Sequence, residues 1–124
     1  MLQITTILFL ISLSVLAGIH FIAEYLFLYW KFPWLDIPMH AFGGIIISLG
    51  VFTLYDFKVI PRRYIKLLAV WLIALVVILG WEVFKLFTGK VIDDTFVIDT
   101  VMDIVIGSVG SLVGYYVANN IRHL

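Results

Sequence analysis

The sequence predicts an all-α protein: an integral membrane, four-helix transmembrane bundle whose helices run alternately up and down. Three observations support this fold class. First, 64% of the 124 residues are hydrophobic and only 13% are charged, whereas a soluble domain is nearer half apolar and a quarter charged. Second, the mean hydropathy is +1.16, and so short a chain could bury only part of that apolar surface in a water-soluble fold. Third, four stretches are long and apolar enough to cross a bilayer, and only short connections separate them.

The whole chain, 1–124, is expected to form one membrane domain. A bilayer core takes about 20 mostly apolar residues per helix. The predicted spans cover about 4–30, 38–57, 64–88 and 96–121. The connections read KFPWLD, KVIPRR and GKVIDD, and because they are this short, neighbouring helices must be antiparallel.

Prolines mark the predicted helix boundaries. Pro33, Pro38 and Pro61 lie in or beside the connections, where proline opens or stops a helix. Asp36 precedes Pro38 by two residues and is a candidate N-cap of the second helix.

The basic residues predict an orientation in the cell membrane. Five of the eight lie around the second connection or at the C-terminus: Lys58, Arg62, Arg63, Lys66 and Arg122. The other three are Lys31, Lys85 and Lys90. Since cytoplasmic loops carry the excess of Lys and Arg, both termini are predicted to be cytoplasmic. Trp30, Trp34 and Trp81 would then form an aromatic belt toward the outer face.

Composition also restricts the partners. The formal net charge is zero, which argues against a nucleic-acid partner. There is no cysteine, so disulfides, thiol catalysis and thiolate metal ligation are excluded. Membrane lipids are the expected surroundings, and the abundant small residues allow a homo-oligomer without requiring one.

Ionisable side chains of all four spans are predicted to lie at a common depth. At 1.5 Å per residue from the cytoplasmic end of each helix, His20 and Glu82 lie about 24 Å up, His40 about 27 Å and Asp103 about 28 Å. The hydrocarbon core is about 30 Å thick. These groups therefore share one layer near the outer boundary, and charges in such helices usually face the interior of the bundle.

Within three of the spans, these residues occur in pairs one helical turn apart. The pairs are His20 with Glu24, Asp36 with His40, and Asp99 with Asp103. Side chains at this spacing share a helix face, so each pair offers two polar groups to the same side, and Glu82 adds a fourth helix to the set.

The carboxylates outnumber the cations near them, which indicates a protonated imidazole, a shared proton or a bound cation. Imidazole and carboxylate ligands suit a divalent metal such as Zn, Mn or Fe. The candidate metal ligands are His20, Glu24, Asp36, His40, Glu82, Asp99 and Asp103. Structural roles stay open for several of them: Asp36 and Asp99 as helix caps, Glu24 in contact with headgroups, and His20 with Glu24 as a simple hydrogen-bonded pair.

Small residues predict close helix packing. The fourth span contains GSVGSLVG, with Gly110 and Gly114 in a Gly-x-x-x-Gly pair, and the second contains Gly43, Gly44 and Gly50. Glycines at such spacing let helix backbones approach each other.

The polar pattern resembles the VanZ-like and YjdF-like families of small bacterial and archaeal membrane proteins. The resemblance covers about 36–116 and rests on Asp36, His40, Gly43, Gly44, Trp81, Glu82, Asp99, Thr100, Asp103 and Gly110. Two positions depart from it. Lys85 stands where VanZ-like proteins usually carry Gln and YjdF-like ones Glu, so Lys85 could itself neutralise a carboxylate, and Asp103 stands where VanZ-like proteins tend to have Asn. The resemblance implies a role in the cell envelope and no settled reaction.

Three functions follow as hypotheses. The first is a metal-dependent membrane enzyme acting on a lipid or lipid-linked envelope substrate, with Glu82 and Asp103 as the catalytic candidates and a metal that activates water. The second is a proton or ion relay, since Asp, Glu and His also build proton pathways. The third is a non-catalytic structural or accessory subunit in which the polar residues only hold the helices in register.

Overall fold

The computed structural model describes residues 4–87 and 96–121, and these ranges are almost entirely helical, with no strand among them. The elements are α1 (Ile4–Tyr25), α2 (Leu28–Lys31), the 3₁₀ turn η1 (Pro33–Leu35), α3 (Asp36–Asp56), the 3₁₀ turn η2 (Arg62–Ile65), α4 (Leu67–Phe87) and α5 (Phe96–Ile121). The all-α prediction is confirmed. Within these described residues, four helices are long and apolar enough to cross a membrane. The predicted connection GKVIDD lies outside the described residues.

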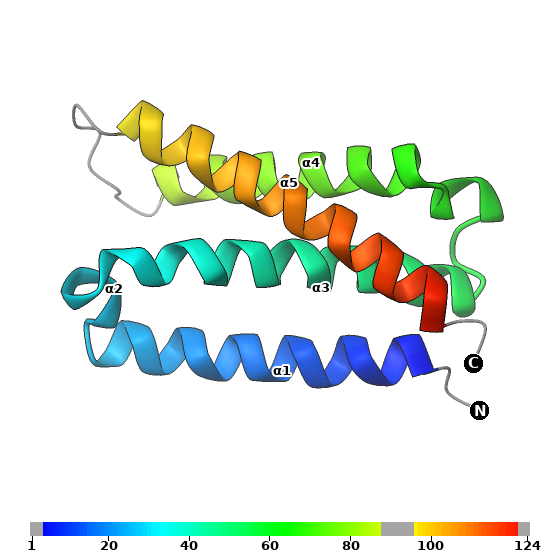
Figure 1. Ribbon diagram of the computed structural model, residues 1–124, viewed down its shortest axis with the longest axis horizontal. Helices are drawn as coiled ribbons and strands as arrows, with labels where there is room; N and C mark the ends of the chain where they lie inside the picture. Colours follow the sequence, from blue (N-terminus) through cyan, green and yellow to red (C-terminus); the bar gives the residue numbers. More distant parts are fainter. Residues whose placement is uncertain (1–3, 88–95, 122–124) are drawn as a thin grey trace.

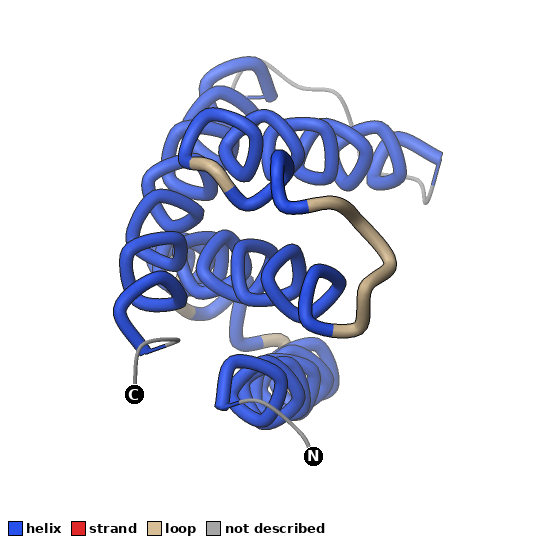
Figure 2. The backbone as a smooth tube through the Cα atoms, turned by 90° about the vertical axis from the view of Figure 1, so that its right-hand side faces the viewer, coloured by secondary structure: helices blue, strands red, loops and turns tan. Residues whose placement is uncertain are grey.

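The four long helices alternate in direction along the chain (Figure 1), as predicted. The packing centres on α3 and α5, which run in the same direction along the bundle, with α5 crossing obliquely over its neighbours. Helix α4 packs against α5 and α3, whereas α1 packs mainly against α3 and lies at one edge (Figure 2). The centre of the bundle is therefore the three-helix unit of α3, α4 and α5.

The first predicted span is broken, which corrects its predicted end at residue 30. Helix α1 ends at Tyr25, and Phe27 adopts a left-handed backbone conformation with φ of 56°. The short helix α2 follows and brings Tyr29 back toward α1, where its hydroxyl lies 3.0 Å from His20 Nδ1. No glycine or proline occurs at this corner, so the usual breaker signals are missing from the sequence.

The second span begins earlier than predicted, and Asp36 is not its N-cap. A 3₁₀ turn that begins at Pro33 leads directly into α3, and Leu35 holds the N-cap position without a side-chain hydrogen bond. Asp36 is instead the first residue of α3. Its charge is still favourable in the first turn of a helix, but its carboxylate is directed to His40.

Glycines bring the backbones of α3 and α5 into contact. A Cβ atom added at Gly44 would overlap the carbonyl oxygen of Gly107, and one added at Gly110 would overlap the carbonyl oxygen of Ala41. The same addition at Gly114 would come within 2.7 Å of another carbonyl oxygen of α3. The predicted packing role of Gly44, Gly110 and Gly114 is confirmed, because only a residue without a side chain permits this approach.

Two other glycines behave differently. Gly50 lies against α1, where an added Cβ would stand 3.0 Å from the ring of Phe9. At Gly43 an added Cβ would meet nothing within 4 Å, so the packing role predicted for Gly43 is wrong.

The interior of the bundle has an apolar end and a polar end. Leu49, Val51 and Phe52 of α3 form the buried cluster with Val70 of α4 and Ala118 of α5. These residues follow His40 on α3, precede Glu82 on α4 and follow Asp103 on α5, so the antiparallel arrangement places the apolar cluster at the opposite end from the ionisable groups.

Hydroxyl groups join the three central helices between the two ends. Ser48 donates a hydrogen bond to the carbonyl of Ser111, and the hydroxyl of Ser111 donates to the carbonyl of Ser108. Trp71 of α4 donates from its indole nitrogen to the hydroxyl of Ser108. These bonds satisfy the buried hydroxyls of Ser48 and Ser111 between the two ends.

We expect Gly44→Ala and Gly110→Ala each to destabilise the protein by about 1–3 kcal/mol, since the added methyl group meets backbone atoms that no side-chain rotation can move. Gly43→Ala is the matched control: it adds the same methyl group to the same helix in open space and should be neutral or slightly stabilising. Thermal unfolding of the purified variants in detergent, followed by circular dichroism, measures the difference. Equal stability of Gly43→Ala and Gly44→Ala would contradict the close α3–α5 contact.

Candidate functional site

Three helices each contribute an ionisable residue to the polar end of the bundle. His40 comes from α3, Glu82 from α4 and Asp103 from α5. His40 Nε2 lies 3.5 Å from Asp103 Oδ2 and 3.9 Å from Glu82 Oε1. Glu82 and Asp103 are 7% and 5% exposed. The prediction that acids and imidazole of these separate spans meet is confirmed for these three residues.

The packing of the helices one turn away explains why they meet. Gly44 follows His40 by four residues, Gly107 follows Asp103 by four, and these two glycines are in contact. An added Cβ at Gly107 would also stand 2.8 Å from Ile78 of α4, which precedes Glu82 by four residues. Because residues four apart lie on the same face of a helix, this contact layer directs all three ionisable side chains toward one another.

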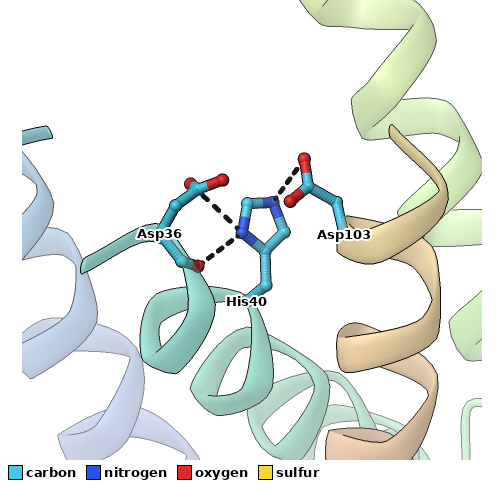
Figure 3. Close-up of side chains that lie close together, drawn as sticks. All are labelled: Asp36, His40 and Asp103. Atoms are coloured by element: carbon cyan, nitrogen blue, oxygen red, sulfur yellow. Dashed lines mark hydrogen bonds and ion pairs between the residues drawn. The ribbon is translucent and has the colours of Figure 1, made fainter. Parts of the chain in front are cut away.

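The ring of His40 is oriented by the residue one turn before it. His40 Nδ1 lies 2.8 Å from the carbonyl oxygen of Asp36 and 3.2 Å from its carboxylate (Figure 3). Both are acceptors, so the Nδ1 atom carries the proton and donates it. In neutral His40, the lone pair of Nε2 then points toward Asp103 and Glu82. Nε2 is buried and has no hydrogen-bond partner among the described residues.

Lys85 provides the cation that faces the carboxylates. Its Nζ lies 2.9 Å from Glu82 Oε2 and 3.0 Å from Asp103 Oδ2, and its side chain is 19% exposed. Lys85 thus neutralises part of the negative charge, as the sequence analysis allowed. With a neutral imidazole, the three carboxylates of Asp36, Glu82 and Asp103 and this one ammonium give a net charge of −3 + 1 = −2.

Three of the predicted metal ligands form a group suited to one ion. Asp36, His40 and Asp103 each offer a ligand atom, and these atoms lie within 4.8 Å of one another. Glu82 adjoins the group through His40 without belonging to it. Glu82 Oε1 is buried and has no hydrogen-bond partner in the described part of the chain, so one carboxylate oxygen beside the group is unused.

The structure does not bring His20 and Glu24 into this group. His20 Nε2 lies 3.9 Å from Glu24 Oε1, and these side chains are 39% and 64% exposed. The close partner of His20 is Tyr29, which sequence reasoning missed because the first span was expected to continue through residue 30. Burial raises the pKa of the Tyr29 phenol, and the Asp36 and Glu24 carboxylates raise it further, so the hydroxyl stays protonated and can donate to His20.

Asp99 is also outside the group. It is exposed near the beginning of α5, whereas Asp103, one turn further, is buried. Asp99 and Asp103 are one turn apart on α5, as expected, but this spacing alone does not place both carboxylates in the interior of the bundle.

Comparisons of the chain with protein-family models, with curated proteins and with solved structures find no match. The resemblance to the VanZ-like and YjdF-like families therefore stays a prediction.

The charges of the cluster predict an order of stabilities for the metal-free protein. Lys85→Met leaves two buried carboxylates without their cation and should cost about 3 kcal/mol, as the loss of one partner of a buried ion pair does. Glu82→Gln should cost less, since Lys85 retains Asp103. The double variant Glu82→Gln/Lys85→Met should be more stable than Lys85→Met alone.

Unfolding in detergent with a chelator present measures these differences as a double-mutant cycle. Costs that simply add would mean that Glu82 and Lys85 are not coupled, contrary to the 2.9 Å contact.

Proposed function

We propose that this chain is a multi-pass protein of the cell membrane that binds a divalent metal ion, Zn, Mn or Fe, through Asp36, His40 and Asp103. The proposed role is that of a metal-dependent enzyme acting on a lipid or lipid-linked envelope substrate at the membrane boundary. Four apolar helices support the membrane assignment, and the group of three ligand atoms supports the metal.

The observation that carries the metal proposal is the orientation of His40. Its Nδ1–H donates a hydrogen bond to the backbone carbonyl oxygen of Asp36, so the carboxylate of Asp36 remains available as a ligand. Its Nε2 is directed at carboxylate oxygens that are themselves acceptors. Two acceptors face each other stably only with a proton or a cation between them. Metal-binding histidines are typically held in this way, with the distal ring nitrogen donating to a carbonyl or carboxylate and the other nitrogen on the metal.

The charge of the cluster points the same way. With a neutral imidazole the net charge of −2 at buried and half-buried positions is costly, and a divalent cation would bring it to zero. Two carboxylate ligands and one imidazole ligand would leave a coordination position for a water molecule, as in catalytic metal sites.

Glu82 is the residue proposed to accept a proton in the reaction. Its Oε1 has no hydrogen-bond partner among the described residues and lies beside the proposed ligand group, so it is the candidate general base for an attacking water. Asp103 is proposed as ligand and charge partner rather than as base, because Oδ2 already accepts from Lys85.

Metal analysis tests this proposal directly. Full-length protein purified in detergent and incubated with Zn²⁺, Mn²⁺ or Fe²⁺ should retain about one equivalent of one of them after desalting, measured by plasma mass spectrometry. His40→Ala and Asp103→Asn should lose it. His20→Ala should retain it, because His20 is the matched histidine outside the ligand group. No retained metal in the wild-type protein, or retention that His40→Ala leaves unchanged, would refute the metal site.

The proposed orientation has both termini and the loop between α3 and α4 in the cytoplasm. Because the chain has no cysteine, single cysteines report accessibility without background. We expect Lys58→Cys to react with a membrane-impermeant maleimide only after the cells are opened, and Trp34→Cys to react in intact cells. Both positions are exposed. The reverse labelling pattern would invert the proposed topology, and labelling of both in intact cells would contradict it.

One observation favours a second candidate, a structural or accessory subunit. Lys85 joins Glu82 of its own helix to Asp103 of α5, and such an ion pair holds two helices in register without any metal. This alternative predicts that the metal-free protein is fully folded and that added metal does not raise its unfolding temperature.

A further inference from the structure

We infer that Lys85 is a built-in competitor of the metal ion: its ammonium group occupies Asp103 in the metal-free protein and must leave that carboxylate when the metal binds. This inference rests on the metal site proposed above and adds the element that controls its occupancy. It assigns Glu82 a second role, as the carboxylate that keeps Lys85 in place after Asp103 has turned to the metal.

The competition follows from a shared oxygen atom. Asp103 Oδ2 lies 3.0 Å from Lys85 Nζ and 3.5 Å from His40 Nε2. It is therefore both the acceptor of the ammonium and the carboxylate oxygen that faces the free nitrogen of His40. A divalent ion between Asp103 and His40 would have an ammonium as its close neighbour, and because Asp103 is buried, the repulsion between the two cations would be strong.

A second carboxylate, that of Glu82, can hold the ammonium of Lys85 once Asp103 binds the metal. Lys85 Nζ lies 2.9 Å from Glu82 Oε2, so the lysine need not leave the cluster when it gives up Asp103. The two carboxylates come from different helices, Glu82 from the helix of Lys85 itself and Asp103 from α5. Metal binding is therefore expected to replace a contact between α4 and α5 with one between α3 and α5.

The buried atom Glu82 Oε1 is the independent sign that the cluster is incomplete as it stands. It has no hydrogen-bond partner in the described residues, and it faces His40 Nε2, which has none either. Lys85 satisfies one oxygen of each carboxylate and leaves this pair of atoms unmatched. A resident ammonium alone thus does not complete the site, which is the situation expected for a competitor rather than for a permanent partner.

Metal affinity in four forms of the full-length protein tests the inference, measured by titration with Zn²⁺ and with Mn²⁺ in detergent at one fixed pH. Lys85→Met should bind at least about tenfold more tightly than the wild-type protein, because the competing charge is gone. Glu82→Gln should bind more weakly than the wild-type protein, because Lys85 then loses the carboxylate of Glu82 and keeps its contact with Asp103.

The double variant Glu82→Gln/Lys85→Met separates local competition from overall charge. It loses one negative and one positive group, so the net charge of the cluster is the same as in the wild-type protein. Tighter binding than wild type in this variant therefore reports removal of the ammonium from Asp103 and not a more acidic site. This variant also keeps the test valid if Lys85→Met alone fails to fold.

The outcomes distinguish this inference from the function on which it rests. Metal binding that depends on His40 but is equal or weaker in both Lys85 variants would overturn the competition and leave the metal site standing. Absence of His40-dependent binding in the wild-type protein would remove the metal site itself and the competition with it.

Discussion

The arrangement of this protein depends on the contact between the backbones of α3 and α5. Gly44 and Gly110 permit an approach that any side chain would prevent, and van der Waals packing of this kind is what associates helices where apolar burial offers no advantage. The contact also determines the rotation of the two helices about their axes. Since His40 and Asp103 each stand one turn before a glycine of this contact, their meeting is a consequence of it.

The third helix completes the same layer. Ile78 of α4 packs at Gly107, and Glu82 follows Ile78 by one turn. The carboxylate of Glu82 therefore lies at the same level of the bundle as His40 and Asp103. Apolar residues occupy the opposite end of the interior, and serine hydroxyls lie between. The cluster of His40, Glu82 and Asp103 thus lies at one end of the interior of the bundle.

The chemistry of the site is governed by an imbalance of acceptors and donors. Asp36 uses the donor of His40, and Lys85 serves one oxygen each of Glu82 and Asp103. What is left over is an imidazole nitrogen and a carboxylate oxygen facing each other at 3.9 Å. Purely structural ion pairs in a low-dielectric interior tend to satisfy all of their members. With a neutral imidazole this one does not, and that imbalance is the observation on which the proposed cation site rests.

The sequence by itself determined the helical class, the number of long apolar helices, the close packing at Gly44, Gly110 and Gly114, and the meeting of His40, Glu82 and Asp103. Each of these follows from properties that are local or periodic along the chain: hydropathy, helix rise, and the spacing of small and polar residues. The tertiary structure decided the rest. It turned Lys85 inward, left Asp99 exposed, kept His20 and Glu24 outside the group and brought Tyr29 to His20 through a corner without a breaker residue. The physical reason is that helical periodicity says which residues share a face, whereas the direction of that face depends on how neighbouring backbones fit together.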